Sequence, residues 1–184
     1  MRKHHLLGAI LLCGGLFSCS SEVIQQANYE IIPLPQEIKI STGNFVLNDR
    51  TSIVYPKGND EMQQNANLLA TYIRQMSGKK LKVIDEQITS NVITLTTGLN
   101  TDNAEAYQLK VTPDNIIIRG ASEAGTFYGI QTLRKSLPAT NKGDISLPGV
   151  EINDYPRFSY RGVHLDVSRH FFPIDSIKRF IDMM

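Results

Sequence analysis

Cysteine, tryptophan and charge of one sign are all scarce in this chain. It has 2 cysteines, Cys13 and Cys19, and no tryptophan. The 19 basic residues nearly balance the 18 acidic ones. Without a basic stripe or an acidic tail, the composition gives no indication of a nucleic-acid partner. Hydrophobic residues at 41% and charged residues at 20% are ordinary for a globular domain.

The amino end has the pattern of a secretion signal. A basic start precedes an apolar run from Leu6 to Phe17, which is too short to span a bilayer comfortably. The run Leu16-Phe17-Ser18-Cys19 resembles a bacterial lipobox, in which the cysteine becomes the lipidated first residue. The alternative is an ordinary cleavage site, but the order hydrophobic, small, cysteine favours lipidation. We therefore expect residues 1–18 to be a lipoprotein signal peptide and residues 19–28 a polar tether.

A lipid on Cys19 predicts anchoring in the bacterial cell envelope, at the outer membrane, on its periplasmic or surface face. Removal of residues 1–18 leaves Cys19 as the only cysteine and a net charge near −1. The mature chain then has no intrachain disulfide, cysteine metal site or cysteine nucleophile. His164 and Asp166 fall on the same face of the strand predicted later in the chain, but two ligands are fewer than a metal needs. No metal or organic cofactor is predicted.

Residues 29–152 predict a small α+β domain with a mixed sheet and two helices. Helical patterns cover 59–76, capped by Asn59 and stopped by Gly78, and the stretch from Ser122 to Leu137. Strand patterns are short; they cover 37–40, 45–47, 52–55, 81–84, 91–96, 107–111, 115–119 and 150–152. Residues 141–149 are expected to be a loop, and the run Ile116-Ile117-Ile118 a central strand covered on both faces.

Two glycines, Gly125 and Gly129, lie one turn apart in the second predicted helix. Each costs about 1 kcal/mol relative to alanine, and we expect close approach of the helix to the sheet to compensate. They do not form a phosphate loop, because no glycine-rich pattern precedes the helix. The carboxylates of this region are interpreted as solvated charges rather than a catalytic group: Asp85, Glu86, Asp102, Glu105 and Glu123.

Residues 153–184 have a strand pattern followed by a helical one. From Tyr160 to Val167 apolar and polar residues alternate, and from Ile174 to Met184 apolar residues recur at helical spacing. A strand, a short connection and a helix are half of a parallel βαβ unit. We therefore expect the first βα unit of an incomplete TIM (β/α)8 barrel, a fold that needs about 250 residues to close.

Four polar residues fall at the carboxyl end of this predicted strand, where barrel enzymes place their sites: Asp166, Ser168, Arg169 and His170. From the residues alone, a merely structural ion pair between Asp166 and Arg169 is as good an interpretation as a functional one.

Two stretches resemble a known family. PRFSYRGVHLDVSRHFFPIDSIKRFIDMM, from Pro156, is similar to the opening of the catalytic barrel of family 20 glycoside hydrolases, the β-N-acetylhexosaminidases. EAYQLKVTPDNIIIRGASEAGTFYGIQTLRKSLP, from Glu105, is similar to the end of the small domain before that barrel. Similar small domains precede O-GlcNAcase-like and α-glucuronidase barrels, so the first stretch is the specific one.

The resemblance implies exo-hydrolysis of terminal N-acetylhexosamine from glycans by a substrate-assisted retaining mechanism. The acetamido oxygen attacks the anomeric carbon, a glutamate is the general acid, and its aspartate neighbour holds the acetamido group. The resemblance also implies that Arg169 binds sugar hydroxyls, with Asp166 orienting its guanidinium. The Asp-Glu pair is expected beyond Met184, so no catalytic residue is assigned. We expect the chain to be an inactive amino-terminal fragment.

Two other functions are left open by the residues. One is a non-catalytic glycan-binding lipoprotein, although it would expose Ile174, Ile177 and Phe180 without a partner. The other is a related glycosidase with the same small domain, which the run from Leu165 to His170 disfavours. The sequence does not indicate an oligomeric state.

Overall fold

The computed structural model describes residues 24–139 and 143–184. The predicted signal peptide and Cys19 lie outside the described residues. Among the helices within these two ranges, none is both long and apolar enough to cross a bilayer.

The described residues form eight strands and three helices. The strands are β1 (Gln25–Gln26), β2 (Glu37–Leu47), β3 (Ser52–Val54), β4 (Lys82–Ile84), β5 (Val92–Thr96), β6 (Tyr107–Val111), β7 (Asn115–Gly120) and β8 (Ile145–Asp154). The helices are α1 (Asp60–Ser77), α2 (Glu123–Ser136) and α3 (Ile174–Met183). All elements except α3 belong to one mixed sheet or to the helices on it, which confirms the predicted small α+β domain.

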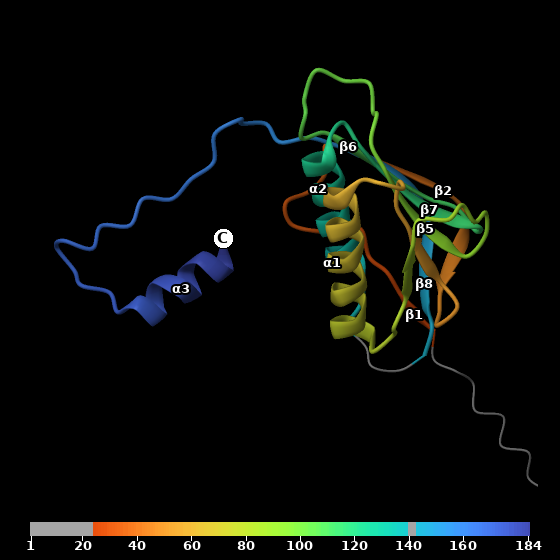
Figure 1. The fold of residues 1–184 in the computed structure, drawn as a ribbon, viewed down its shortest axis with the longest axis horizontal. Coiled ribbons are helices and arrows are strands. Elements are labelled where there is room, and N and C mark those ends of the chain that lie inside the picture. The colour runs from red at the N-terminus through yellow and green to blue at the C-terminus, as the bar shows by residue number, and fades with distance from the viewer. Residues whose placement is uncertain (1–23, 140–142) are drawn as a thin grey trace, which may run out of the picture.

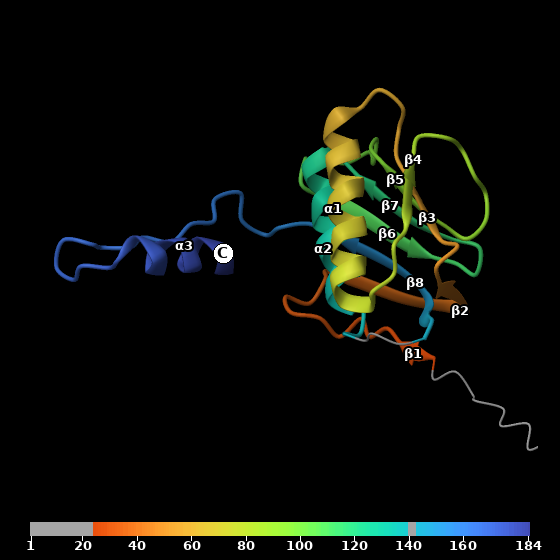
Figure 2. The ribbon, with the colours of Figure 1, turned by 60° about the horizontal axis from the view of Figure 1, so that its bottom comes forward.

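The sheet has the strand order β1-β8-β6-β7-β5-β3-β4, and β2 also pairs with β8. Strands β4, β3, β5 and β7 are mutually parallel, whereas β6 runs antiparallel to both β7 and β8. Helices α1 and α2 lie side by side on one face of this sheet (Figures 1 and 2). The domain therefore has two layers, and its core lies between the helices and the sheet.

Helix α1 has the limits that its sequence predicts. The Asn59 Oδ1 accepts a hydrogen bond from the Met62 backbone N–H at 3.0 Å, and Gly78 ends the helix with φ of 73°. Its apolar stripe faces the sheet and is fully buried: Met62, Ala66, Leu69 and Ile73.

Helix α2 packs so close to the sheet that two of its positions admit no side chain. A Cβ on Gly125 would collide with the backbone carbonyl oxygen of Ala106. A Cβ on Gly129 would lie 2.5 Å from the Ile118 Cγ2 atom. The expected close approach of this helix is confirmed, and it offsets the poor helix propensity of glycine.

Two predicted breaks in the sheet are wrong. Residues 37–47 form one strand, β2, because the turn residues between Ile40 and Asn44 are absorbed in a bulge. Strand β8 starts at Ile145, within the predicted loop, and includes Pro148. Pro148 lies opposite that bulge, and between the β8 residues paired with β1 and those paired with β6. A missing N–H disturbs the hydrogen-bond ladder least at such a position.

Two further expectations need correction at the edges of the core. Gln25 and Gln26, within the predicted tether, pair in parallel with β8, and Ala27 is buried. Ile116 and Ile118 are fully buried under the helices, but Ile117 on the opposite face is only half-buried. The run of three isoleucines thus marks a central strand covered on one face.

The last thirty residues leave the domain. Residues 155–173, all described, contain no regular secondary structure, so the strand predicted from Tyr160 to Val167 does not form here. A strand needs a neighbour for its backbone hydrogen bonds, and the described chain places none beside this segment. Helix α3 confirms the predicted helix but has no residue buried against the described chain. Figure 1 shows the segment extending away from the sheet to α3.

Candidate functional site

The structure brings the two predicted substrate-binding residues together. The Nε of Arg169 donates to the Asp166 Oδ2 at 2.7 Å. The other carboxylate oxygen, Oδ1, accepts the backbone N–H groups of Ser168 at 2.8 Å and Arg169 at 3.2 Å. Asp166 therefore holds the backbone turn that carries Arg169 and also the Nε end of the Arg169 guanidinium.

This arrangement leaves the outer part of the guanidinium available. The Arg169 side chain is 86% exposed, whereas that of Asp166 is 31% exposed. Both of its terminal nitrogens keep their N–H groups for another acceptor, since Asp166 takes only the Nε proton. The Arg169 hydrogen bond, reinforced by the two backbone N–H groups, holds the pKa of Asp166 below its ordinary value. The carboxylate is thus charged at neutral pH and orients the fork.

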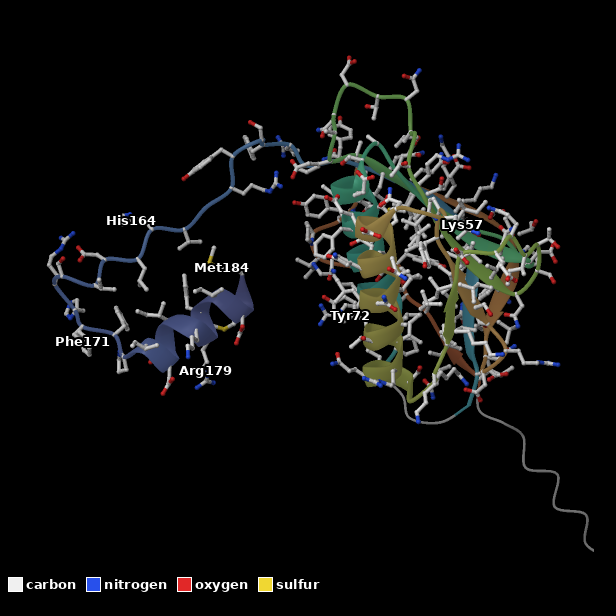
Figure 3. All side chains as sticks on the ribbon, in the orientation of Figure 1. Lys57, Tyr72, His164, Phe171, Arg179 and Met184 are labelled. Carbon is white, nitrogen blue, oxygen red and sulfur yellow. The ribbon has the colours of Figure 1, made fainter. Side chains whose placement is uncertain are left out.

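The neighbouring polar residues are exposed and do not form a metal site. His164 and His170 are both exposed, and Figure 3 shows His164 on the extended segment before α3. Within residues 24–139 and 143–184, no three histidine, cysteine or carboxylate side chains are grouped as metal ligands.

Two of the five carboxylates interpreted as solvated charges have specific partners instead. Glu123 accepts a hydrogen bond from the Asn59 Nδ2 at 3.0 Å, which lowers its pKa and ties the starts of α1 and α2 together. Glu105 is paired with Arg161. That interpretation is wrong for these two residues.

The Glu105 pair joins the small domain to the segment that follows it. Arg161 donates through Nη2 to the Glu105 Oε1 at 2.6 Å and through Nη1 to the Oε2 at 3.2 Å. The Tyr128 hydroxyl on α2 donates to the same Oε1 at 3.0 Å and accepts from Arg161 at 3.1 Å. Hydrogen bonding to Arg161 lowers the pKa of Glu105. We call Glu105, Tyr128 and Arg161 the junction cluster.

A cavity of about 490 Å³ lies beside the junction cluster, between α2, the loop before β2 and the segment after β8. Its wall includes the buried Tyr107, whose hydroxyl bonds to the Thr132 hydroxyl at 2.5 Å and donates to the Asp154 Oδ2 at 2.9 Å. Burial raises the pKa of Tyr107, so its hydroxyl stays protonated. These three side chains therefore satisfy one another's hydrogen bonds in the wall of the cavity.

Sequence reasoning identified Asp166 and Arg169 but missed the junction cluster. Glu105 and Arg161 are 56 positions apart, and no periodicity links a loop residue to one after a linker. Only the fold makes them neighbours. Chemically, the exposed guanidinium of Arg169 offers hydrogen-bond donors that suit hydroxyl groups.

Family comparison covers nearly all the described residues. Residues 28–155 match the model of glycosyl hydrolase family 20, domain 2, and residues 158–184 match that of glycosyl hydrolase family 20, catalytic domain. The second match shows that the segment after the small domain is the beginning of the family's catalytic barrel.

Relatives and solved structures agree with this. A beta-hexosaminidase of Porphyromonas gingivalis is 35% identical over 99% of this chain, which covers 25% of that relative. A beta-N-acetylhexosaminidase of Cellulomonas fimi is 30% identical over 84% of this chain, which covers 32% of it. The family 20 beta-N-acetylhexosaminidase structure from Streptomyces coelicolor superposes with a TM-score of 0.73 at 30% identity, over 83% of this chain and 32% of that one.

The chain therefore spans about a quarter to a third of the length of these relatives. With a family model matched over most of its length, it belongs to glycosyl hydrolase family 20.

Proposed function

We propose that this chain is the amino-terminal part of a β-N-acetylhexosaminidase, which removes terminal N-acetylhexosamine from glycans. The observation that carries the proposal is the catalytic-domain match of residues 158–184, which contains the Asp166–Arg169 pair. In support, the relatives that align with nearly the whole chain are hexosaminidases, and a Streptomyces plicatus beta-hexosaminidase of similar fold was solved with GlcNAc as product.

Arg169 binds two hydroxyl groups of the terminal sugar in this proposal. A guanidinium is planar and presents a fork of donors, which suits two adjacent oxygen acceptors. Asp166 holds the fork through Nε and leaves both terminal nitrogens to the sugar. Because Asp166 keeps its own charge, it also stabilises the positive charge of Arg169.

Bond cleavage follows the substrate-assisted route, in which the acetamido group of the sugar is the nucleophile. The general acid and the residue that holds the acetamido group come from other parts of the enzyme, so the small domain and Arg169 bind and position but do not cleave. This chain by itself is accordingly inactive.

The sugar-binding role is tested in the complete enzyme that contains this chain. Arg169→Lys keeps the charge but loses the fork, and Asp166→Asn keeps the shape but loses the charge. Each removes about one charge-assisted hydrogen bond, so kcat/KM on an aryl N-acetylglucosaminide should fall about 10- to 100-fold. Arg179→Lys, in α3, is the matched control and should change little. Unchanged turnover and affinity in both site variants would refute the assignment.

We further propose that a lipid on Cys19 anchors the enzyme in the bacterial cell envelope. The lipobox-like run before Cys19 supports this, and several acyl chains hold a protein firmly at a membrane surface. Radiolabelled palmitate should be incorporated into the wild type and not into the Cys19→Ala variant, which should appear in the soluble fraction. Equal labelling of both proteins would contradict the anchor.

A non-catalytic glycan-binding lipoprotein is the competing function. It predicts that the complete gene product binds N-acetylglucosamine without hydrolysing the aryl glycoside. Turnover by the complete product, together with none by this chain alone, distinguishes the enzyme from the binding protein.

A further inference from the structure

The small domain carries a preformed acceptor for one residue of the catalytic domain. Glu105 precedes β6, and its backbone N–H donates to the Asn103 Oδ1 at 3.0 Å. The neighbouring Ala104 carbonyl accepts the Ser122 hydroxyl at 2.6 Å. Tyr128 projects from α2, where Gly125 and Gly129 hold the helix tightly on the sheet. Glu105 is thus held by the hydrogen bonds of its loop, and Tyr128 by the close packing of α2 on the sheet.

Arg161 fills this acceptor from the other side of the domain boundary. Its position lies within the part of the chain that matches the catalytic-domain model, three residues after the match begins. The guanidinium makes two hydrogen bonds to Glu105 and one to Tyr128, and its Nη1 also donates to the Phe158 carbonyl at 2.5 Å. Four contacts on one side chain define its direction, which a single exposed ion pair does not.

The surface around the junction cluster is apolar in a way that exposed surface usually is not. Three large apolar side chains line the cavity and are 49–68% exposed: Leu34, Tyr155 and Phe158. A gathered apolar rim of this kind marks a surface that another protein part covers. The catalytic domain is the part at hand, because its first residues lie against this rim.

Few residues separate the junction cluster from the sugar-binding arginine. Arg161 and Arg169 are eight positions apart in the one segment that leads from the small domain into the barrel. On folding as a barrel strand, eight residues span about 26 Å with a fixed direction. Whatever holds Arg161 thus sets where the strand starts and how Arg169 is aimed.

From these observations we infer that Glu105 and Tyr128 form a docking site for Arg161, and that the small domain thereby positions the first barrel strand and the substrate-binding Arg169. The small domain is then a positioning element of the enzyme rather than a separate binding module. Glu105, Tyr128 and Arg161 are positioning residues, because in this inference they act on the sugar only through the segment that carries Arg169. The activity readout of this inference rests on the proposed hexosaminidase function, whereas its structural readout does not.

The test uses the complete enzyme with Glu105→Gln, Arg161→Gln and the double variant. The matched control is Glu151→Gln, which breaks the exposed 4.0 Å pair between Glu151 on β8 and Lys110 on β6, away from the junction. A misaimed Arg169 should raise KM for an aryl N-acetylglucosaminide about tenfold, because small displacements of a positioning group are costly. Loss of folded protein alone would instead lower the apparent kcat at constant KM.

Both single variants should raise KM, and Arg161→Gln should do so at least as much as Glu105→Gln, because it removes all four contacts of the guanidinium. The double variant should be no worse than Arg161→Gln, since the contact with Glu105 is already lost there. Glu151→Gln should leave KM unchanged. Additive effects in the double variant, or a fall in kcat alone, would overturn the inference.

The second readout is limited proteolysis between Tyr155 and Tyr160. The Glu105→Gln, Arg161→Gln and double variants should be cleaved in this segment several-fold faster than the wild type and Glu151→Gln, because a segment held by the junction cluster opens rarely. If the wild type hydrolyses no N-acetylhexosaminide, the proposed function fails. The proteolysis rates still show whether Glu105 and Tyr128 hold Arg161. Equal cleavage rates in all five proteins would show that the junction cluster does not hold this segment.

Discussion

The described residues up to Asp154 and those from Tyr155 onward differ in whether their apolar side chains are buried. The first group buries a continuous core between α1, α2 and the sheet, including Leu69, Ile93 and Ile118 at 0% exposure. The second group buries none, and Ile174 in the amphipathic α3 is 70% exposed. Figure 3 shows the same contrast between crowded and separate side chains. The small domain contains its own packing partners, whereas the barrel segment has only its sequence pattern.

The comparison teaches where fold information resides. An amphipathic helix or strand specifies which face it buries, but burial itself needs a partner. Helix α1 obtains that partner from β3 and β5 within the same domain. Helix α3 has the stronger apolar face of the two and finds nothing to cover it among the described residues.

The largest expected difference between the two regions is in core substitutions. Leu69→Ala in α1 removes a fully buried side chain and should lower the free energy of unfolding by about 3 kcal/mol. Ile181→Ala in α3 removes a side chain that is 61% exposed, so it should change that free energy by less than about 0.5 kcal/mol. Urea unfolding of this chain measures both. Equal losses would mean that α3 packs on the small domain in solution.

A second test uses the glycines that keep α2 on the sheet. Helix propensity alone predicts that Gly125→Ala stabilises the protein by about 1 kcal/mol. The Ala106 carbonyl occupies the space of the new Cβ, so we expect a loss of about 2 kcal/mol instead. Ala124→Gly, at the exposed neighbouring position, is the control and should lose stability by propensity alone. Thermal unfolding of both variants decides, and a stabilised Gly125→Ala would contradict the close packing.

A third test compares two ion pairs of the small domain. Lys79 is buried, with its side chain only 8% exposed, and its Nζ lies 3.0 Å from the Asp144 Oδ1. Asp144→Ala leaves that ammonium without its carboxylate and should cost about 1.5 kcal/mol, less than for a fully buried pair because Asp144 is 33% exposed. Glu151→Ala, which breaks the exposed pair with Lys110, should cost less than about 0.5 kcal/mol in the same urea titration. Similar costs would show that burial of Lys79 contributes nothing.

The sequence was most informative where one local rule decided the structure. The limits of α1 followed from Asn59 and Gly78, and the close approach of α2 followed from two otherwise costly glycines. It was wrong where pairing overrode local chemistry. Gly43 looked like a turn between two strands, but its φ of 87° is accommodated in a bulge of β2. Pro148 looked like a loop residue, but β8 continues through it.

The site shows the same limit. The Asp166–Arg169 pair was predictable because the two residues are three positions apart. Glu105 was interpreted as solvated because nothing near it in sequence could pair with it, and its partner lies on the far side of a linker. Local patterns find local pairs; contacts between α2, the loop before β6 and the barrel segment exist only once the domain has folded.

The smallest expected effect concerns the charge of Asp166 in the segment without a core. Its pKa is lowered first by Arg169 and then by the N–H groups of Ser168 and Arg169. A lowered pKa means that the carboxylate form is favoured above the unfolded-state value, and that this contribution is lost as the pH falls through the lower folded-state value. Arg169→Gln removes the first cause and keeps the two N–H groups. Carboxyl NMR titration should therefore show the Asp166 pKa moving part of the way back toward an ordinary aspartate value. A complete return would mean that the turn opens without the arginine, and no movement would mean that the ion pair does not form in solution, so that substrate alone would have to orient Arg169.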